Sequence, residues 1–261
     1  MEPTVHLSQE QIEFYHENGF LAIDFLAPAE EVEWMRGIYD RLFASRAGRE
    51  VGDQFDLGGT DEEGKEAVLP QILGPVKYAP ELAEGQFRVN AAHVVKQLLG
   101  DGAQMGGDHA ILKPPKNGVP TPWHQDEAYW DEATLHNAVS IWMPLQEATI
   151  ENGCMWFLPG THRLPVQVHQ PLGNDPRVHA LELLEEVDMA KAVACPIPAG
   201  GCTIHHCRTY HYTGPNLSEQ PRRAFIMGGG VAGVKLDPPR DFFWNKIKQT
   251  ARDERARSGK A

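Results

Sequence analysis

AVSIWMPL, residues 138–145, is an apolar run that follows Asn137 and ends next to a proline. Runs of this length, rich in β-branched and aromatic residues and bounded by turn residues, are typical of buried strands. Between residues 105 and 235 the pattern recurs in HAILKPP (109–115), CMWFLPG (154–160), AVACPIP (192–198), GCTIHHCRTYHYT (201–213) and RAFIMGGGV (223–231). Many short strands of this kind predict a β-sandwich or barrel.

Helices are predicted before these strands. Ser8 and Gln11 form a capping-box pattern, and Asn18 followed by glycine is a stop signal, so a short first helix is expected. Pro28 stands where the first turn of a second helix is expected, and apolar residues then recur every three or four positions up to Gly48. The fold class is therefore expected to be mainly β with flanking helices.

The remaining segments complete one predicted domain of residues 1–261. Residues 51–65 are glycine-rich and acidic without periodicity, which indicates a mobile loop. A third helix is expected at about 81–99, and residues 241–261 predict a helix anchored by Phe242, Phe243 and Trp244 that ends in a charged tail. We expect a helical and scaffold part at 1–104, a β core at 105–235, and a C-terminal helix and tail at 236–261.

Composition narrows the class of protein. The 261 residues carry a net charge of −12, which opposes non-specific binding to nucleic acid or to anionic membranes. No apolar run approaches the roughly 20 residues that cross a bilayer, and the N-terminus lacks the features of a secretory signal. The four cysteines form no CxxC pair, which suits free thiols in a reducing compartment. We therefore expect a cytoplasmic protein, and no feature singles out an oligomeric state.

The segment TPWHQDEAYW, residues 121–130, places a histidine and a carboxylate two positions apart. On a strand, residues i and i+2 face the same side, so His124 and Asp126 would converge while Gln125 points away. Both side chains are metal ligands, although a lone His-x-Asp triplet also arises by chance. A third ligand is needed before the pattern predicts a metal site.

His211 is the candidate third ligand. It is followed by a Gly-Pro-Asn turn at 214–216 and then by Arg222, so we expect His211 and Arg222 on neighbouring strands. Two histidines and a carboxylate on one face of an octahedron leave three positions open, as in non-haem iron oxygenases. The planar fork of Arg222 can pair bidentately with the carboxylate of a chelating 2-oxo acid. The same three ligands also suit catalytic zinc in a hydrolase, where Arg222 would have no role.

With these residues in place, the chain resembles the phytanoyl-CoA dioxygenase family of iron and 2-oxoglutarate oxygenases. The resemblance runs from NGFLAIDFL (18–26) to MGGGV (227–231), through KPP (113–115), HQD (124–126), AVSIWMPL (138–145), ENGCMWFLPGTH (151–162), and His211 with Arg222 eleven residues later. It implies a double-stranded β-helix, a cupin-like jelly roll. It also implies an enzyme that uses ferrous iron, 2-oxoglutarate and dioxygen, and that releases succinate and carbon dioxide.

The resemblance further implies roles for individual residues. Iron is expected at His124, Asp126 and His211, with 2-oxoglutarate anchored by Arg222. Further cosubstrate contacts are implied for Thr213, Trp142, His109 and Gln71. The carboxylate at position 126 argues against halogenation, because iron halogenases of this superfamily carry a small residue there.

We expect hydroxylation of a small organic metabolite. The alternatives are an acyl-CoA hydroxylase of the same family and a metal-binding β-barrel without oxygenase activity. Glu127, Asp131 and Glu132 predict an acidic cavity mouth that would repel the phosphates of coenzyme A. Tyr129 and Trp130 would either pack in the core or line this mouth.

Other residues near the motifs are given structural roles. His205 and His206 are adjacent on a predicted strand and face opposite sides, so neither is expected to bind metal. His162 is expected to make a structural hydrogen bond in its turn. Arg223 is expected to face away from Arg222 and to contact another element.

Overall fold

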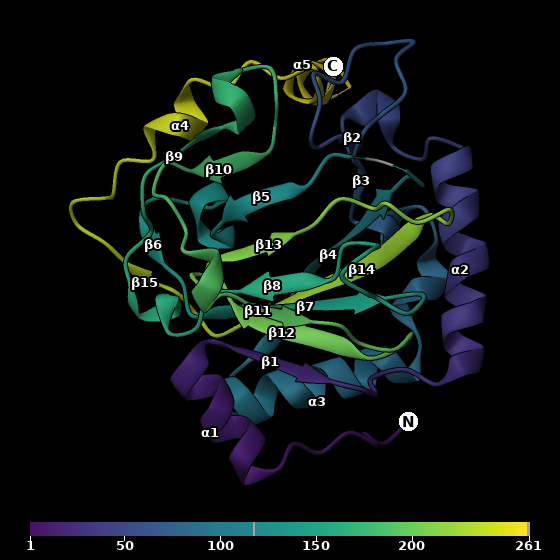
Figure 1. Ribbon diagram of the computed structural model, residues 1–261, viewed down its shortest axis with the longest axis vertical. Coiled ribbons are helices and arrows are strands. Elements are labelled where there is room, and N and C mark those ends of the chain that lie inside the picture. The colour runs from purple at the N-terminus through teal and green to yellow at the C-terminus, as the bar shows by residue number, and fades with distance from the viewer. Residues whose placement is uncertain (117, 260–261) are drawn as a thin grey trace.

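The computed structural model describes residues 1–116 and 118–259 and contains two antiparallel sheets that pack face to face (Figure 1). The larger sheet consists, in spatial order, of β1 (Phe20–Ile23), β12 (Cys202–His206), β7 (Ala138–Pro144), β14 (Arg222–Gly230), β4 (Gln104–Lys113), β3 (Pro70–Leu73) and β2 (Gln54–Asp56). The smaller sheet consists of β11 (Val193–Cys195), β8 (Met155–Phe157), β13 (His211–Thr213) and β5 (Thr121–His124). These interleaved strands confirm the predicted jelly-roll core.

An apolar cluster fills part of the space between the two sheets. Strand residues alternate between faces, so Ala224 and Ile226 of β14 share the inner face of the larger sheet with Trp142 of β7. They are buried in one cluster with Met155 and Phe157 of β8. Burying one large apolar side chain contributes roughly 1.5–3 kcal/mol, so this cluster holds the sheets together.

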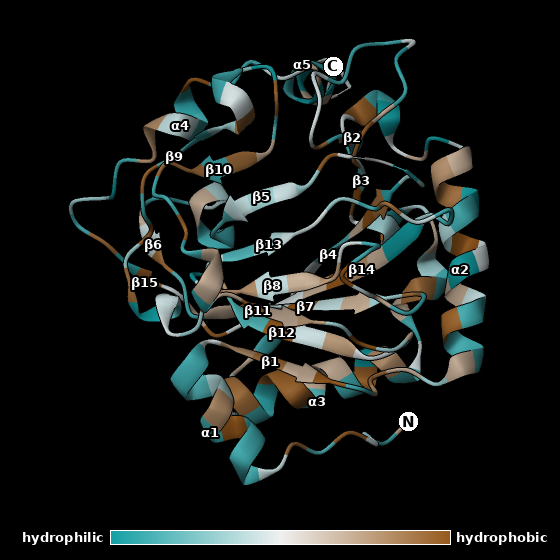
Figure 2. Cartoon of the chain, in the orientation of Figure 1, coloured by the Kyte–Doolittle hydropathy of each residue, from teal (hydrophilic) through white to brown (hydrophobic). Residues whose placement is uncertain are grey.

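Helices α2 (Ala29–Ala44) and α3 (Gln86–Leu99) pack on the outer side of the larger sheet. Val95 of α3 is buried in one cluster with Phe225 and Met227, which alternate with the inward residues of β14. Figure 2 shows brown and teal turns along α2, as expected of a helix with one buried face. The first predicted helix is α1 (Gln9–Asn18), and both hydrogen bonds of its capping box are present.

Helix limits differ from the prediction where tertiary contacts set them. α2 ends before the predicted Gly48. α3 begins later than predicted because Pro80–Ala83 form a separate 3-10 turn. The carboxylate of Glu31, from α2, accepts hydrogen bonds from the first two N–H groups of α3. Because the side chain that caps α3 comes from another helix, the sequence around the start of α3 gives no signal of where this helix begins.

The C-terminal segment forms two short helices, α4 (Phe243–Lys246) and α5 (Ala251–Ser258), where a single helix was predicted. Of the aromatic residues at 242–244, the first and third are buried as expected, but Phe243 is exposed. Residues 260 and 261, the end of the predicted charged tail, lie outside the described residues.

The predicted loop at 51–65 contains β2 and is held by two buried carboxylates. Asp56 accepts hydrogen bonds from the backbone N–H groups of residues 68 and 69. Asp61 contacts Arg255 of α5. The expectation of an irregular segment is therefore wrong at β2, and β1, β2 and β3 all come from the part predicted as helical and scaffold.

Two further strand pairs complete the fold. They are β9 (His169–Pro171) with β10 (Leu181–Leu183), and β6 (Thr134–Leu135) with β15 (Val234–Lys235). Judged by length and apolar content, none of the helices in residues 1–116 and 118–259 could cross a bilayer.

Candidate metal and cosubstrate site

Two paired strands of the smaller sheet carry the two candidate histidine ligands. His124 ends β5 and is the register partner of His211 on β13, and their ring centroids lie 4.1 Å apart. Asp126 opens the 3-10 turn η4 (Asp126–Tyr129) and is not part of the expected strand. Gln125 keeps an extended backbone, with φ −120° and ψ 132°, so Asp126 still faces the same side as His124.

The donor atoms of these three residues converge. Nε2 of His124 lies 3.8 Å and Nε2 of His211 lies 3.5 Å from Oδ1 of Asp126, and all three donor atoms lie within 4.8 Å of one another. Each imidazole donates its Nδ1–H to a backbone carbonyl, His124 to Pro122 at 2.7 Å and His211 to Thr209 at 2.9 Å. These hydrogen bonds orient the rings and leave Nε2 free for a metal.

The second oxygen of Asp126 is held by two side chains. Oδ2 accepts hydrogen bonds from Ser140 at 2.6 Å and from Nε2 of His205 at 3.1 Å. Burial opposes ionisation, but His211 and His205 outweigh it and hold the pKa of Asp126 well below its usual range. Burial and the nearby His211 lower the pKa of His124 to about 3. A charged carboxylate and a neutral imidazole are the forms that bind a divalent cation.

Arg222 faces the same cavity, which has a volume of about 340 Å³. Its side chain is buried, and its Nε and Nη1 have no hydrogen-bond partner among the described residues. The buried hydroxyl of Thr213 is likewise without a partner among them. Burial lowers the pKa of Arg222 to about 10, so the guanidinium keeps its charge at pH 7. Because a buried charge without a counter-charge is strongly destabilising, this cavity fits an anionic ligand.

Arg222 and His211 lie on opposite sheets, whereas the sequence predicted neighbouring strands. β13 pairs with β5 and β8 in the smaller sheet, and β14 pairs with β4 and β7 in the larger one. The turn at 214–216 therefore crosses from one sheet to the other. As a result, the histidine and the arginine approach the cavity from opposite sides.

The other candidate cosubstrate residues also line this cavity. Its lining includes Gln71, His109, Trp142 and Thr213, together with Tyr129 and Trp130. The guanidinium carbon of Arg222 lies 5.2 Å from the ring centroid of Trp142, which is a cation–π contact. Of the two roles left open, Tyr129 and Trp130 both take the position at the cavity, and Tyr129 also packs against a buried apolar cluster that includes Leu181 and Trp244.

The sequence of residues 15–224 matches the family described as phytanoyl-CoA dioxygenase (PhyH). This chain belongs to that family. A probable alpha-ketoglutarate-dependent hypophosphite dioxygenase of Stutzerimonas stutzeri is 31% identical over 228 residues, which cover 85% of this chain and 78% of that protein. A phytanoyl-CoA dioxygenase domain-containing protein 1 of Bos taurus is 26% identical over 257 residues, which cover 84% of this chain and 88% of that protein.

Solved structures agree with this membership. EvdO2 from Micromonospora carbonacea var. aurantiaca has a TM-score of 0.80 and 40% identity, covering 94% of this chain and 99% of that chain. Its complex with 2-oxoglutarate has a TM-score of 0.78 and 37% identity, with the same coverage. The resemblance to the phytanoyl-CoA dioxygenase family and the jelly-roll fold predicted from the sequence are both confirmed.

In this member of the phytanoyl-CoA dioxygenase family, three residues without a predicted cosubstrate or metal role support the site. Ser140 and His205 hold Asp126. The sequence does offer a signal for Ser140, because it is the lone hydroxyl in an apolar run. Lys113, the first residue of KPP, is fully buried and donates to the carbonyls of Thr213 at 3.2 Å and Gly214 at 2.5 Å. These bonds hold the turn by which the chain leaves β13.

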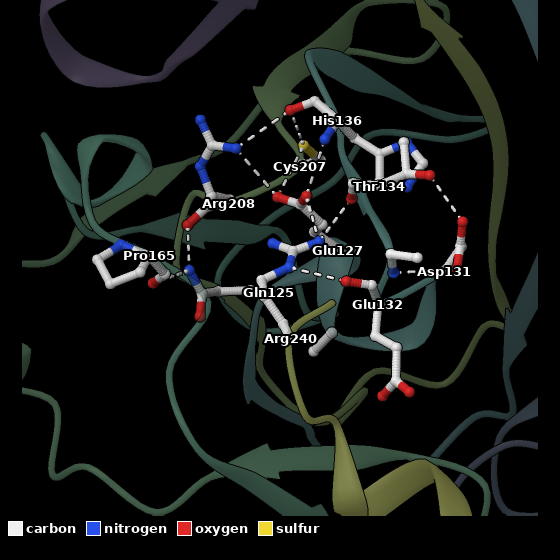
Figure 3. Close-up of polar contacts among 12 residues, drawn as sticks. Gln125, Glu127, Asp131, Glu132, Thr134, His136, Pro165, Cys207, Arg208 and Arg240 are labelled. Atoms are coloured by element: carbon white, nitrogen blue, oxygen red, sulfur yellow. Dashed lines mark hydrogen bonds and ion pairs between the residues drawn. The ribbon is translucent and has the colours of Figure 1, made fainter. Parts of the chain in front are cut away.

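Glu127 lies behind the cavity, so the prediction that it lines an acidic mouth is wrong. Its carboxylate is fully buried and pairs with Arg208 at 3.1 Å and Arg240 at 3.0 Å (Figure 3). It also accepts a hydrogen bond from the backbone N–H of His136 at 2.9 Å. These contacts link the turn that carries Asp126 to the segment before β13 and to the C-terminal region.

Asp131 and Glu132 also lie outside the cavity lining. Asp131 pairs with Lys235 at 3.0 Å, and Glu132 pairs with Lys246 at 3.2 Å. Glu127, Asp131 and Glu132 therefore form no acidic mouth that would repel the phosphates of coenzyme A.

His162, His206 and Arg223 have structural contacts, as expected. His206 faces away from the donor atoms, His162 donates its Nε2–H to a backbone carbonyl of α1, and Arg223 pairs with a carboxylate of α2. His205 reaches Asp126 without joining the three converging donor atoms.

Proposed function

We propose that this chain binds ferrous iron through His124, Asp126 and His211 and binds 2-oxoglutarate against Arg222. With dioxygen it hydroxylates a small organic compound and releases succinate and carbon dioxide. Its family makes the chain an iron- and 2-oxoglutarate-dependent dioxygenase. The assignment of roles to particular residues is supported by the geometry of the cavity.

The observation that carries these roles is the unpaired, buried guanidinium of Arg222 in the cavity that the three metal ligands share. A planar fork with free donors pairs bidentately with a carboxylate. 2-Oxoglutarate has a carboxylate at each end, so one end can meet Arg222 while the other lies at the donor atoms. A zinc hydrolase, or a metal-binding barrel without activity, would leave Arg222 without a partner.

Bound iron would supply the activation of dioxygen and the oxidising power. The residues of the chain position the reacting groups and shield them from water. His124, Asp126 and His211 would hold the iron and leave room for the cosubstrates to bind it. Ser140 holds Oδ2 of Asp126 and so keeps Oδ1 directed toward Nε2 of His124 and of His211, where the iron would bind. Apolar lining residues such as Met155 and Ile226 keep water from the reacting centre.

Anaerobic titration of the metal-free protein with ferrous iron and 2-oxoglutarate tests the proposal. A 2-oxoglutarate chelate of iron absorbs visible light, whereas a zinc chelate does not. His124→Ala, Asp126→Ala and His211→Ala are each expected to abolish iron binding and succinate formation, because each removes one of three ligands. His206→Ala, which faces away, is expected to keep both. Full activity in any of the three ligand variants would remove that residue from the site.

We also propose a cytoplasmic location. The four cysteines Cys154, Cys195, Cys202 and Cys207 are all buried free thiols, which supports a reducing compartment. Fractionation of the source cells with an antibody against this chain would test the compartment.

A further inference from the structure

A larger groove adjoins the cavity. Its volume is about 1200 Å³, against about 340 Å³ for the cavity that holds the candidate ligands. The two share the lining residues Leu73, His109, Trp130, Ser140 and Ile226. Because Ser140 donates directly to Asp126, this shared wall lies next to the metal ligands. A compound in the groove therefore has access to the metal side of the cavity.

Glycines form part of the lining of this groove. Gly107 is one of them and lies at a β-bulge, where the pairing of β4 with β14 shifts register between Met227–Asp108 and Gly229–Met105. A Cβ built at Gly107 meets no atom within 4 Å, and one built at Gly228 lies 3.2 Å from the carbonyl oxygen of Gly107. Neither residue has a positive φ. The backbone does not require glycine at Gly107, and the missing side chain leaves a broad, open surface.

The charged residues of the groove already have partners. Arg88 contacts Asp108, and Lys77 pairs with Asp53 at 2.8 Å. Among the described residues the groove therefore presents no unpaired cation. A ligand rich in phosphate, such as coenzyme A, needs lysine or arginine side chains that are free to bind it. The pairing favours an uncharged ligand.

We infer that the groove binds an uncharged substrate made of two or more linked or fused rings. One ring lies against Trp130, whose flat face suits it, and the rest of the molecule lies over Gly107. A volume above the roughly 300–1,000 Å³ of pockets for drug-sized ligands would be left mostly empty by a single small ring. This inference rests on the proposed function and adds the substrate class to it.

Succinate release by the iron-loaded full chain, with and without added probe compounds, tests this substrate class. The probes are neutral oligosaccharides, neutral fused-ring aromatic compounds, acyclic amino acids and acyl-CoA thioesters. Stimulation is expected from one or both of the first two sets, and the responding set tells linked rings from fused rings. Stimulation confined to amino acids or acyl-CoA, or none from any multi-ring probe, would overturn the inference.

Substitutions at Gly107 link the response to the groove. Gly107→Leu fills the open surface and is expected to lower multi-ring stimulation by at least about tenfold, while Gly107→Ala keeps most of it. Gly37→Leu is the matched control, because Gly37 is exposed on α2 and also has no atom within 4 Å of a built Cβ. Undiminished stimulation in Gly107→Leu would overturn the inference.

Unstimulated succinate release and the visible absorption of the iron and 2-oxoglutarate complex report on the proposed function separately. Both are expected to be the same in Gly37→Leu and in the parent protein, because Gly37 lies on α2, outside the groove and the cavity. If the parent protein lacks both, the proposed function fails. If the parent has both and only the response to multi-ring probes is missing, the substrate class alone fails.

Discussion

The hydroxyl of Ser140 donates a 2.6 Å hydrogen bond to Oδ2 of Asp126, and Oδ1 of the same carboxylate faces the two histidines. Ser140 belongs to β7 of the larger sheet, whereas Asp126 follows β5 of the smaller sheet. The hydrogen bond therefore joins the two sheets at the candidate metal site. It holds the carboxylate in one orientation without a metal.

Ser140→Ala is expected to weaken ferrous iron binding by about 10- to 100-fold, the usual effect of losing a group that orients a ligand. Iron affinity would be measured by competition with a chelator. Ser45→Ala, which removes a hydroxyl at the end of α2, is the control. An unchanged affinity in Ser140→Ala would mean that His205 alone orients the carboxylate.

Arg222→Leu is expected to raise sharply the 2-oxoglutarate concentration needed for half-maximal turnover. Losing one partner of a buried charge pair costs on the order of 2–5 kcal/mol. Iron binding is expected to persist, because Arg222 is not a ligand. The control is Arg223→Leu, since Arg223 faces α2 and pairs with Asp40 at 2.7 Å. If Arg223→Leu and not Arg222→Leu changed the 2-oxoglutarate requirement, the cosubstrate carboxylate would bind elsewhere.

Glu127→Gln is expected to lower the free energy of unfolding by on the order of 3 kcal/mol, because it leaves Arg208 and Arg240 beside a neutral, buried amide. Denaturant unfolding of the metal-free protein measures the loss. Asp131→Asn breaks the exposed pair with Lys235 and is expected to change stability little. Equal losses in the two variants would contradict a special contribution from the buried pairs.

Stability is expected to fall as the pH is lowered through the window from 6.5 to about 4, partly because of His169. This ring donates Nδ1–H to the carbonyl of Gln167 and accepts at Nε2 from the backbone N–H of Gln125, so it must stay neutral. Burial is the main cause that lowers the pKa of His169 from 6.5 to about 4. In that window the unfolded chain binds a proton that the folded chain does not.

The slope of unfolding free energy against pH tests this expectation. One such histidine contributes up to about 1.4 kcal/mol per pH unit, with stability decreasing toward acid. His169→Gln removes the titrating group and is expected to make the slope shallower in the metal-free protein. Identical slopes in parent and variant would show that His169 is protonated equally in both states.

Features encoded over short distances were predicted well from the sequence. The capping box of Ser8 and Gln11 predicted the start of α1, because both of its hydrogen bonds lie within one turn. The spacing of His124 and Asp126 predicted that they face the same side, because the extended backbone of the intervening residue is sufficient for this. Apolar runs with turn residues at their ends predicted the strands of the jelly roll after residue 105, but they did not predict β1, β2 and β3.

Only the tertiary structure decided what these elements face. Arg222 and His211 are eleven residues apart, yet they lie on opposite sheets because each strand hydrogen-bonds to distant parts of the chain. Glu127 was predicted to line a solvated mouth, but it is buried because Arg208 and Arg240, 81 and 113 residues further along, pair with it. Residue type and spacing determine which side of a strand a group takes. Burial and charge pairing depend on contacts between distant segments, which form only when the sheets close.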